Sequence, residues 1–409
     1  MATTSSARAA FRYADFRYYL AARFLAAIAT EMQALAVAWQ VYGLTRRPLD
    51  LGLVGLAQFL PGIFLFLLAG HTADRLPRQR ILQACAFAFS ICSLLLITFT
   101  LRGLTVVYPI YLAILWNGVV RAFNGPASQA FLPLLVPAAE FPSAVAWAAS
   151  TFQGATILGP LAGGLVYGAT GSPLAVYCAA AVGYVIAFAL FSAMRPRVVE
   201  RVPSGRSLRV VFDGFHYIWR NKLILGAISL DLFAVLLGGA VALLPVYASE
   251  ILKVGATGLG LLRGAPGMGA IATAAVVAAW PVRRRAGAKL FLCVFGFGLF
   301  TLVFALSRNV ILSLAALFVV GACDMVSVVI RHTLVQLGTP DEMRGRVSAV
   351  NSVFIGASNE VGQFESGLTA HWFGAVPAVV IGGLGTILVV VLWAWLFPEL
   401  RSADTIHEK

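Results

Sequence analysis

The sequence predicts an all-α membrane protein that crosses a bilayer many times. Of its 409 residues, 60% are hydrophobic and only 11% are charged, whereas soluble domains carry about a quarter charged residues. Apolar segments of the size that spans a bilayer, about 20 residues, recur from one end to the other. The short alternating strands of a transmembrane β-barrel are missing from the pattern. These three observations exclude a soluble globule and favour a polytopic helical protein.

The apolar segments predict twelve transmembrane helices. Each segment is long enough to cross the hydrocarbon region as a helix. In chain order they lie at residues 17–43, 51–73, 81–101, 107–124, 144–168, 173–194, 223–248, 257–280, 288–306, 309–332, 346–372 and 375–397.

The longest hydrophilic connection divides these helices into two groups of six. We therefore predict an N-terminal bundle at 1–194, a cytoplasmic linker at 195–222, a C-terminal bundle at 223–397 and a tail at 398–409.

An internal repeat supports two related halves. Arg121–Pro137 aligns with Asp324–Pro340 at a constant offset of 203 residues. The aligned anchors are few, so a chance match of two prolines is the alternative. Repeats of this kind are typical of secondary transporters, whose halves rock about a site near the midplane.

The basic residues predict the orientation. If both termini lie in the cytoplasm, the inner connections hold 21 of the 30 Lys and Arg residues. The outer connections then hold only Arg46, Arg47, Arg102, Lys253 and Arg308. Because positive residues favour the cytoplasmic side, the net charge of +13 indicates topology rather than nucleic-acid binding.

The sequence indicates no enzyme, cofactor or metal site. Its five cysteines all fall in predicted helices, and none forms a CxxC pair. No phosphate-binding loop of the Gly-x-x-x-x-Gly-Lys-Ser/Thr type is present, so ATP hydrolysis is not the expected energy source.

A basic hairpin joins the second and third predicted helices, with its characteristic positions at Gly70, Asp74, Arg75, Arg78 and Arg80. This spacing resembles the loop 2–3 signature of the major facilitator superfamily, from which it departs at Pro77 and Gln79. The resemblance implies the fold of that superfamily and a gating role, in which Asp74 pairs with a basic residue or a helix end in one closed state. In the alternative, the arginines only anchor the loop inside.

The fifth predicted helix carries a second motif, made of Gly154, Gly159, Pro160, Gly163 and Gly164. Its Gly-Pro-x-x-Gly-Gly core resembles the antiporter motif of drug-exporting members of the superfamily. Small residues let membrane helices approach closely, and Pro160 permits a bend. Ordinary small-residue packing is the alternative explanation.

Ionisable residues inside predicted spans are candidate proton or substrate sites. They are Arg23, Glu31, Arg121, Asp231, Arg263, Asp324, Glu360 and Glu365, with Asn359 and Gln363 beside the last two. Static pairs are the alternative, such as Glu31 with Arg23 or Asp324 with Arg331, although spacings of eight and seven residues are long for contact on one helix. Arg121 is also expected near a helix end, where it could extend to the inner surface instead.

The eleventh predicted helix is too polar to face lipid. Asn351, Ser358 and Glu365 form one stripe at about 100° per residue, and a second stripe lies next to it. This helix is expected to face protein or a water-filled cavity. Interhelical hydrogen bonding would also explain the pattern.

Three further segments are similar to the siderophore and drug exporters of the superfamily, the enterobactin exporter and macrolide efflux subgroup. They are Arg121–Ala127, Phe131–Pro137 and Thr339–Val347. This resemblance implies a monomeric exporter of small amphipathic molecules in a bacterial inner membrane, coupled to protons and working by alternating access. A lipid or lysophospholipid flippase, and a membrane sensor or scaffold that transports nothing, are the alternatives.

Overall fold

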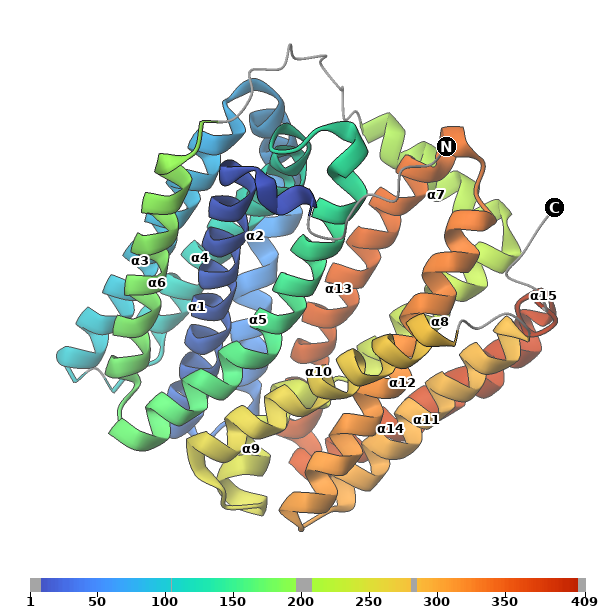
Figure 1. Cartoon of the computed structure of the whole chain (residues 1–409). Helices are drawn as coiled ribbons and strands as arrows, with labels where there is room; N and C mark the ends of the chain where they lie inside the picture. Colours follow the sequence, from blue (N-terminus) through green and yellow to red (C-terminus); the bar gives the residue numbers. More distant parts are fainter. Residues whose placement is uncertain (1–8, 104, 196–207, 281–284, 404–409) are drawn as a thin grey trace. The chain divides into compact units, whose positions relative to one another are not determined.

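The computed structural model describes residues 9–103, 105–195, 208–280 and 285–403, and the described chain is helical. Contacts divide it into two compact units (Figure 1). Unit 1 holds residues 1–45 and 57–206, and unit 2 holds 46–56 and 207–409. The division therefore falls inside the second long helix as well as in the connection predicted at 195–222.

Twelve helices of at least 16 residues follow the twelve predicted segments. In unit 1 they are α1 (Ala14–Thr45), α2 (Pro48–Arg75, whose start belongs to unit 2), α3 (Arg78–Leu101), α4 (Tyr108–Phe131), α5 (Phe141–Thr170) and α6 (Pro173–Ala193). In unit 2 they are α8 (Lys222–Leu237), α10 (Gly255–Ala279), α11 (Ala286–Leu306), α12 (Val310–Leu337), α13 (Asp341–Phe373) and α14 (Ala375–Leu396).

Nine helical segments among the described residues are long and apolar enough, one by one, to cross a membrane. The fourth and fifth helices meet the same criterion only together, as a pair bent by 117°. Helix α13 falls short because of its Asn, Ser and Glu residues. Helices that face protein or water tolerate such residues, so the prediction of a polytopic helical fold is confirmed, and its count of twelve fits the helices observed.

Two predicted helices differ in detail from the structure. Helix α4 continues through Pro126 to Phe131, seven residues beyond its predicted end, because polar residues near Pro126 resemble a terminus in sequence. The seventh span is broken after Leu237: a 3₁₀ turn (Ala240–Leu243), α9 (Leu244–Val246) and a π-helical turn (Tyr247–Ile251) complete it. Gly238 and Gly239 lie at this break, where glycine weakens a helix.

In unit 1, α1 lies between α5 and α6, and α3 lies between α4 and α6 (Figure 1). Small residues on the flanking helices permit this close approach. A Cβ atom at Gly163 of α5 would lie 3.0 Å from the Met32 Cα, and one at Gly183 of α6 would lie 3.2 Å from the Ala29 Cβ. Fully buried aromatic residues, among them Tyr19 and Phe131, fill the core.

In unit 2, α12 packs between α10 and α11, and α14 covers α8 and α11. The first turns of α2 also belong here, because Gly52 lies against the α13 backbone, where an added Cβ would be 3.1 Å from the Phe364 Cα. Part of the predicted linker forms the helix α7 (Leu208–Arg220), which packs on α13. An ion pair of 3.0 Å joins Arg346 to Asp213 at this contact.

The two units repeat one helix crossing. In unit 1, Gly118 of α4 lies directly against the backbone carbonyl of Gln58 in α2. In unit 2, Gly321 of α12 lies directly against the carbonyl of Pro266 in α10. The two glycines are 203 residues apart, which is the offset of the internal sequence repeat.

We expect Gly321→Val to destabilise the protein by about 1–3 kcal/mol or more, because overpacking at a backbone contact forces the two helices apart. Gly356→Val in α13 is the control, since no atom lies within 4 Å of a Cβ added there. Thermal unfolding of the purified variants measures the difference. Equal melting temperatures would contradict the role assigned to the crossing.

Candidate transport sites in the two units

Unit 1 contains a cavity of about 320 Å³ that gathers three of the predicted candidates, Arg23, Glu31 and Arg121. Five helices supply its wall: α1, α3, α4, α5 and α6. Phe89 and Phe152 give it apolar surface, while the two arginines and the glutamate give it charge of both signs. A mostly apolar cavity with a few convergent polar groups is the usual form of a small-molecule site.

Arg23 is held within the wall of this cavity by aromatic residues. Its Nη1 donates to the Tyr19 hydroxyl over 3.2 Å, and its guanidinium carbon lies 5.8 Å from the Phe152 ring centroid. Tyr19 is itself fully buried and donates to the Ser128 carbonyl over 2.9 Å. Cation–π contact and the hydrogen bond together fix the position of the positive charge.

Glu31 lies on the same helix and in the same cavity, where it is half-buried. Eight residues, about 12 Å along a helix, separate it from Arg23, and no ion pair joins these two side chains in the described structure. Its neighbour on α5 is Gly159: a Cβ added there would lie 2.5 Å from the Glu31 Cβ. The Gly-Pro-x-x-Gly-Gly segment therefore places its glycine directly against the carboxylate-bearing residue.

Arg121 lies in the interior of α4, ten residues before its end, and not near a helix terminus as the sequence suggested. Its side chain is exposed and lines the cavity together with Asn124, Gly125 and Gln129. Thr30 also lines this cavity, and its hydroxyl is hydrogen-bonded to the Tyr184 hydroxyl over 3.0 Å. The cavity thus carries two arginines and one glutamate.

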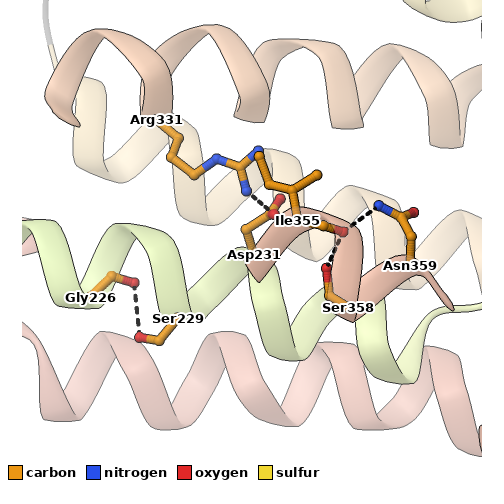
Figure 2. Close-up of polar contacts among 7 residues, drawn as sticks. All are labelled: Gly226, Ser229, Asp231, Arg331, Ile355, Ser358 and Asn359. Atoms are coloured by element: carbon orange, nitrogen blue, oxygen red, sulfur yellow. Dashed lines mark hydrogen bonds and ion pairs between the residues drawn. The ribbon is translucent and has the colours of Figure 1, made fainter. Parts of the chain in front are cut away.

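Unit 2 contains a buried ion pair between Asp231 of α8 and Arg331 of α12 (Figure 2). Arg331 is 2% exposed and Asp231 is 7% exposed. Sequence spacing offered Arg331 only as a partner for Asp324 on its own helix, and that pair does not form among the described residues. The observed pair joins two helices, which the sequence could not indicate.

Asp324 lies beside this pair. It shares with Asp231 a cavity of about 10 Å³, also lined by Cys293, Cys323 and Ser327. Arg263 of α10 is half-buried outside that cavity, and its Nη1 is buried without a hydrogen-bond partner in the described structure. Unit 2 therefore brings together Asp231 and Asp324 but not Arg263.

The polar residues of α13 form hydrogen bonds along their own helix. Gln363 donates to Glu360 over 3.3 Å, Thr369 donates to Glu365 over 2.7 Å, and Asn359 donates to the Ile355 carbonyl over 2.8 Å (Figure 2 shows the last). These bonds differ from the interhelical contacts that the sequence offered as an alternative. Ser358 and Ser366 are buried, whereas Asn359 is exposed.

The basic hairpin braces helix ends within unit 1. Arg78 donates to the Ala130 carbonyl over 2.8 Å, near the end of α4, where a positive charge is favourable. Gln79, which departs from the family signature, donates to the Phe191 and Met194 carbonyls over 2.8 Å each and so caps α6. Pro77 is the residue before α3. The Asp74 side chain lies outside the described residues.

Of the remaining motif positions, Gly70 is buried, while Arg75 and Arg80 are exposed. In α5, Pro160 and Gly164 are buried and Gly154 is half-buried. Sequence reasoning missed Tyr19, whose only signal is its position four residues before Arg23 on one helical face.

The chain matches the family described as transmembrane secretion effector over residues 5–409. Among curated proteins, the enterobactin exporter EntS of Shigella boydii serotype 4 is 26% identical over 94% of this chain and 92% of its own length. Enterobactin exporter EntS of an Escherichia coli O1:K1 strain is 25% identical over the same shares.

Solved structures show the same fold. A nucleoside transporter, NupG, has a TM-score of 0.69 at 14% identity, covering 94% of this chain and 99% of its own. A D-xylose–proton symporter has a TM-score of 0.70 at 15% identity, covering 96% and 100%. Together with the family match, the helical fold and the multi-pass pattern place this chain among membrane transporters rather than enzymes. The chain belongs to the transmembrane secretion effector family of the major facilitator superfamily.

Proposed function

We propose that this protein is a secondary active exporter of small amphipathic molecules, driven by proton antiport and working by alternating access. The cavity of unit 1 is the observation that carries the proposal. Its apolar and aromatic wall suits the hydrophobic part of a substrate, and Arg23, Glu31 and Arg121 suit a polar part.

The cavity favours substrates with an anionic or zwitterionic group. Two arginines and one glutamate give its wall a net charge of +1 when all three are ionised. Enterobactin exporters are among the relatives, and they support a siderophore or a drug of similar character as the exported compound. The charged headgroup of a phospholipid could bind to the same three side chains, so lipid flipping is the alternative function that the experiment must distinguish from export.

The proposal places the protein in a bacterial inner membrane as a monomer with both termini in the cytoplasm. The excess of Arg and Lys in alternate connections supports this orientation. The basic hairpin then lies on the cytoplasmic side, where Asp74 and Arg75 are the proposed gate residues and Gly70, Arg78 and Arg80 support the turn.

Transport by the purified protein in liposomes tests the proposal. A panel of siderophores and drugs is offered with and without an imposed proton gradient, and a fluorescent phospholipid is assayed in parallel. We expect one or more panel compounds to accumulate against their gradient only when protons flow the other way. Transport of a panel compound at the same rate with and without the proton gradient would reject antiport. Flipping of the phospholipid without transport of any panel compound would establish the flippase alternative.

We expect Glu31→Gln to lower gradient-driven transport at least about tenfold, equivalent to ~1.4 kcal/mol, because a carboxylate that lines the cavity is replaced by a neutral group. Glu342→Gln removes an exposed carboxylate at the start of α13 and is the matched control. Initial rates in liposomes, normalised to protein incorporated, measure the effect. Equal rates for the two variants would exclude Glu31 from the site.

A further inference from the structure

In unit 2, the acidic groups of the cluster of Asp231, Asp324 and Arg331 outnumber its basic group. Two carboxylates and one guanidinium come together from α8 and α12. The Asp231–Arg331 pair is sealed, with 7% and 2% of the two residues exposed, whereas Asp324 is half-buried. In the described structure no hydrogen bond or ion pair links the Asp324 carboxylate to another side chain.

The space at this cluster excludes a substrate. Its cavity measures about 10 Å³, and a single water molecule needs roughly 10–15 Å³ on this scale. The cavity therefore has room for about one water molecule at most, whereas a proton bound to a carboxylate needs no such space. The cavity of unit 1, at about 320 Å³, is large enough for part of a small molecule.

Charge neutrality sets the number of protons. With both carboxylates ionised, the cluster has a net charge of −1, and uncompensated charge inside a membrane protein is strongly unfavourable. One added proton makes the cluster neutral. Because Arg331 already neutralises the sealed Asp231, the proton belongs on the more accessible Asp324.

The neighbouring helices do not supply a second compensating charge at the cavity. The described ionisable residue of α10 is Arg263, which does not line the cavity. On α11 they are Lys289, which is exposed, and Cys293, which lines the cavity. Helix α12 itself adds Cys323, which lines it, and the exposed His332. Helix α8 adds Lys222 at its first residue, nine positions before Asp231. Helices α7, α13 and α15 also pack on α8, and none of their described ionisable residues lines the cavity.

We propose that Asp231, Asp324 and Arg331 form a one-proton site, in which Asp324 binds the proton and the Asp231–Arg331 pair is its fixed counterpart. The buried Nε of Arg331 has no acceptor among the described residues, so the guanidinium retains a donor for a second carboxylate. The inference rests on the proposed antiport and deepens it: proton and substrate occupy different cavities, built from different helices, and do not compete for one carboxylate.

Infrared difference spectroscopy of the full-length protein in lipid nanodiscs at about pH 7 tests the proton count directly, since a protonated carboxylic acid has its own carbonyl band. Asp324→Asn should remove one protonated carboxyl from the wild-type spectrum. Asp231→Asn should remove the same band, because the positive charge of Arg331 then balances the negative charge of an ionised Asp324, and the cluster is neutral without a bound proton. The double variant D231N/R331Q should retain the band, because no positive charge is left in the cluster to balance an ionised Asp324. Asp324 therefore stays protonated.

A band that survives Asp324→Asn would overturn the assignment, and a band that survives Asp231→Asn would overturn the neutrality rule. The single variants both keep a neutral cluster and are expected to fold; the double variant, also neutral when Asp324 is protonated, provides the second test. These spectra need no transport. If the bands behave as expected but no compound exchanges for protons, the proton site stands and the antiport proposal fails.

Transport measurements on Asp324→Asn test the proton-binding role of Asp324 separately from export itself. We expect Asp324→Asn to lose the response of substrate transport to an imposed proton gradient, whereas Glu342→Gln, which removes an exposed carboxylate outside the cluster, should keep that response. Gradient-driven transport that persists at the wild-type level would overturn the role of Asp324 while leaving export itself in place.

Discussion

Gly159→Ala is expected to abolish gradient-driven transport while leaving the helical content of the protein unchanged. A Cβ atom at this position would lie 2.5 Å from the Glu31 Cβ and 3.1 Å from the Ile28 carbonyl oxygen. Real Cβ atoms do not approach so closely, so α5 must move away from α1 or Glu31 must leave its place in the cavity. Small residues at helix contacts have this function in membranes.

A second glycine of the same helix provides the control. At Gly154 the nearest atom to an added Cβ is Phe24 Cε2, at 4.0 Å, so Gly154→Ala should transport as the wild type does. Initial rates in liposomes, with circular dichroism to verify folding, compare the two variants. If both lose transport equally, the antiporter-like motif acts through something other than its contact with Glu31.

The number and order of the long helices could be predicted because a membrane allows few solutions. Backbone groups must be hydrogen-bonded within the bilayer, so each apolar segment of about 20 residues becomes a helix. The prediction was wrong at the end of α4, where Pro126 lies inside the helix rather than beyond it. Proline in a membrane helix is tolerated because neighbouring helices satisfy the freed carbonyl.

The site was predicted in its residue types but not in its pairings. Arg23, Glu31 and Arg121 meet in one cavity because α1 and α4 both contribute to its wall. Arg331 pairs with Asp231 across two helices rather than with Asp324 along one. Helix packing decides such pairings, and a single sequence gives the face of each helix without giving its neighbour.

Gly159 and the break after Leu237 show the same limit. The sequence predicted that small residues in the fifth helix permit close helix packing, and the structure adds that Glu31 lies against Gly159. Nothing in the apolar pattern of 223–248 predicted a break, although Gly238 and Gly239 stand at it. There, Gly239 lies against α13, and an added Cβ would be 3.0 Å from the Gly362 carbonyl oxygen. A close approach of backbones therefore explains a glycine that periodicity left unexplained.

Arg331→Gln is expected to destabilise the protein by about 3–5 kcal/mol, the usual cost of removing one partner of a buried ion pair. The substitution leaves Asp231, 7% exposed, without its positive partner. An uncompensated carboxylate can regain neutrality by binding a proton. The deficit of this variant should therefore shrink as the pH falls and grow as it rises. Thermal unfolding of the purified variant across a pH series measures both the deficit and its sign.

The double variant D231N/R331Q is the matched control for this prediction. It replaces the ion pair by two neutral amides, so it should recover most of the lost stability and show a weaker pH dependence than Arg331→Gln alone. Buried pairs behave in this way because much of the cost of a single removal comes from the charge left behind. A double variant as unstable as Arg331→Gln would mean that the Arg331 side chain stabilises unit 2 by its packing rather than by its charge.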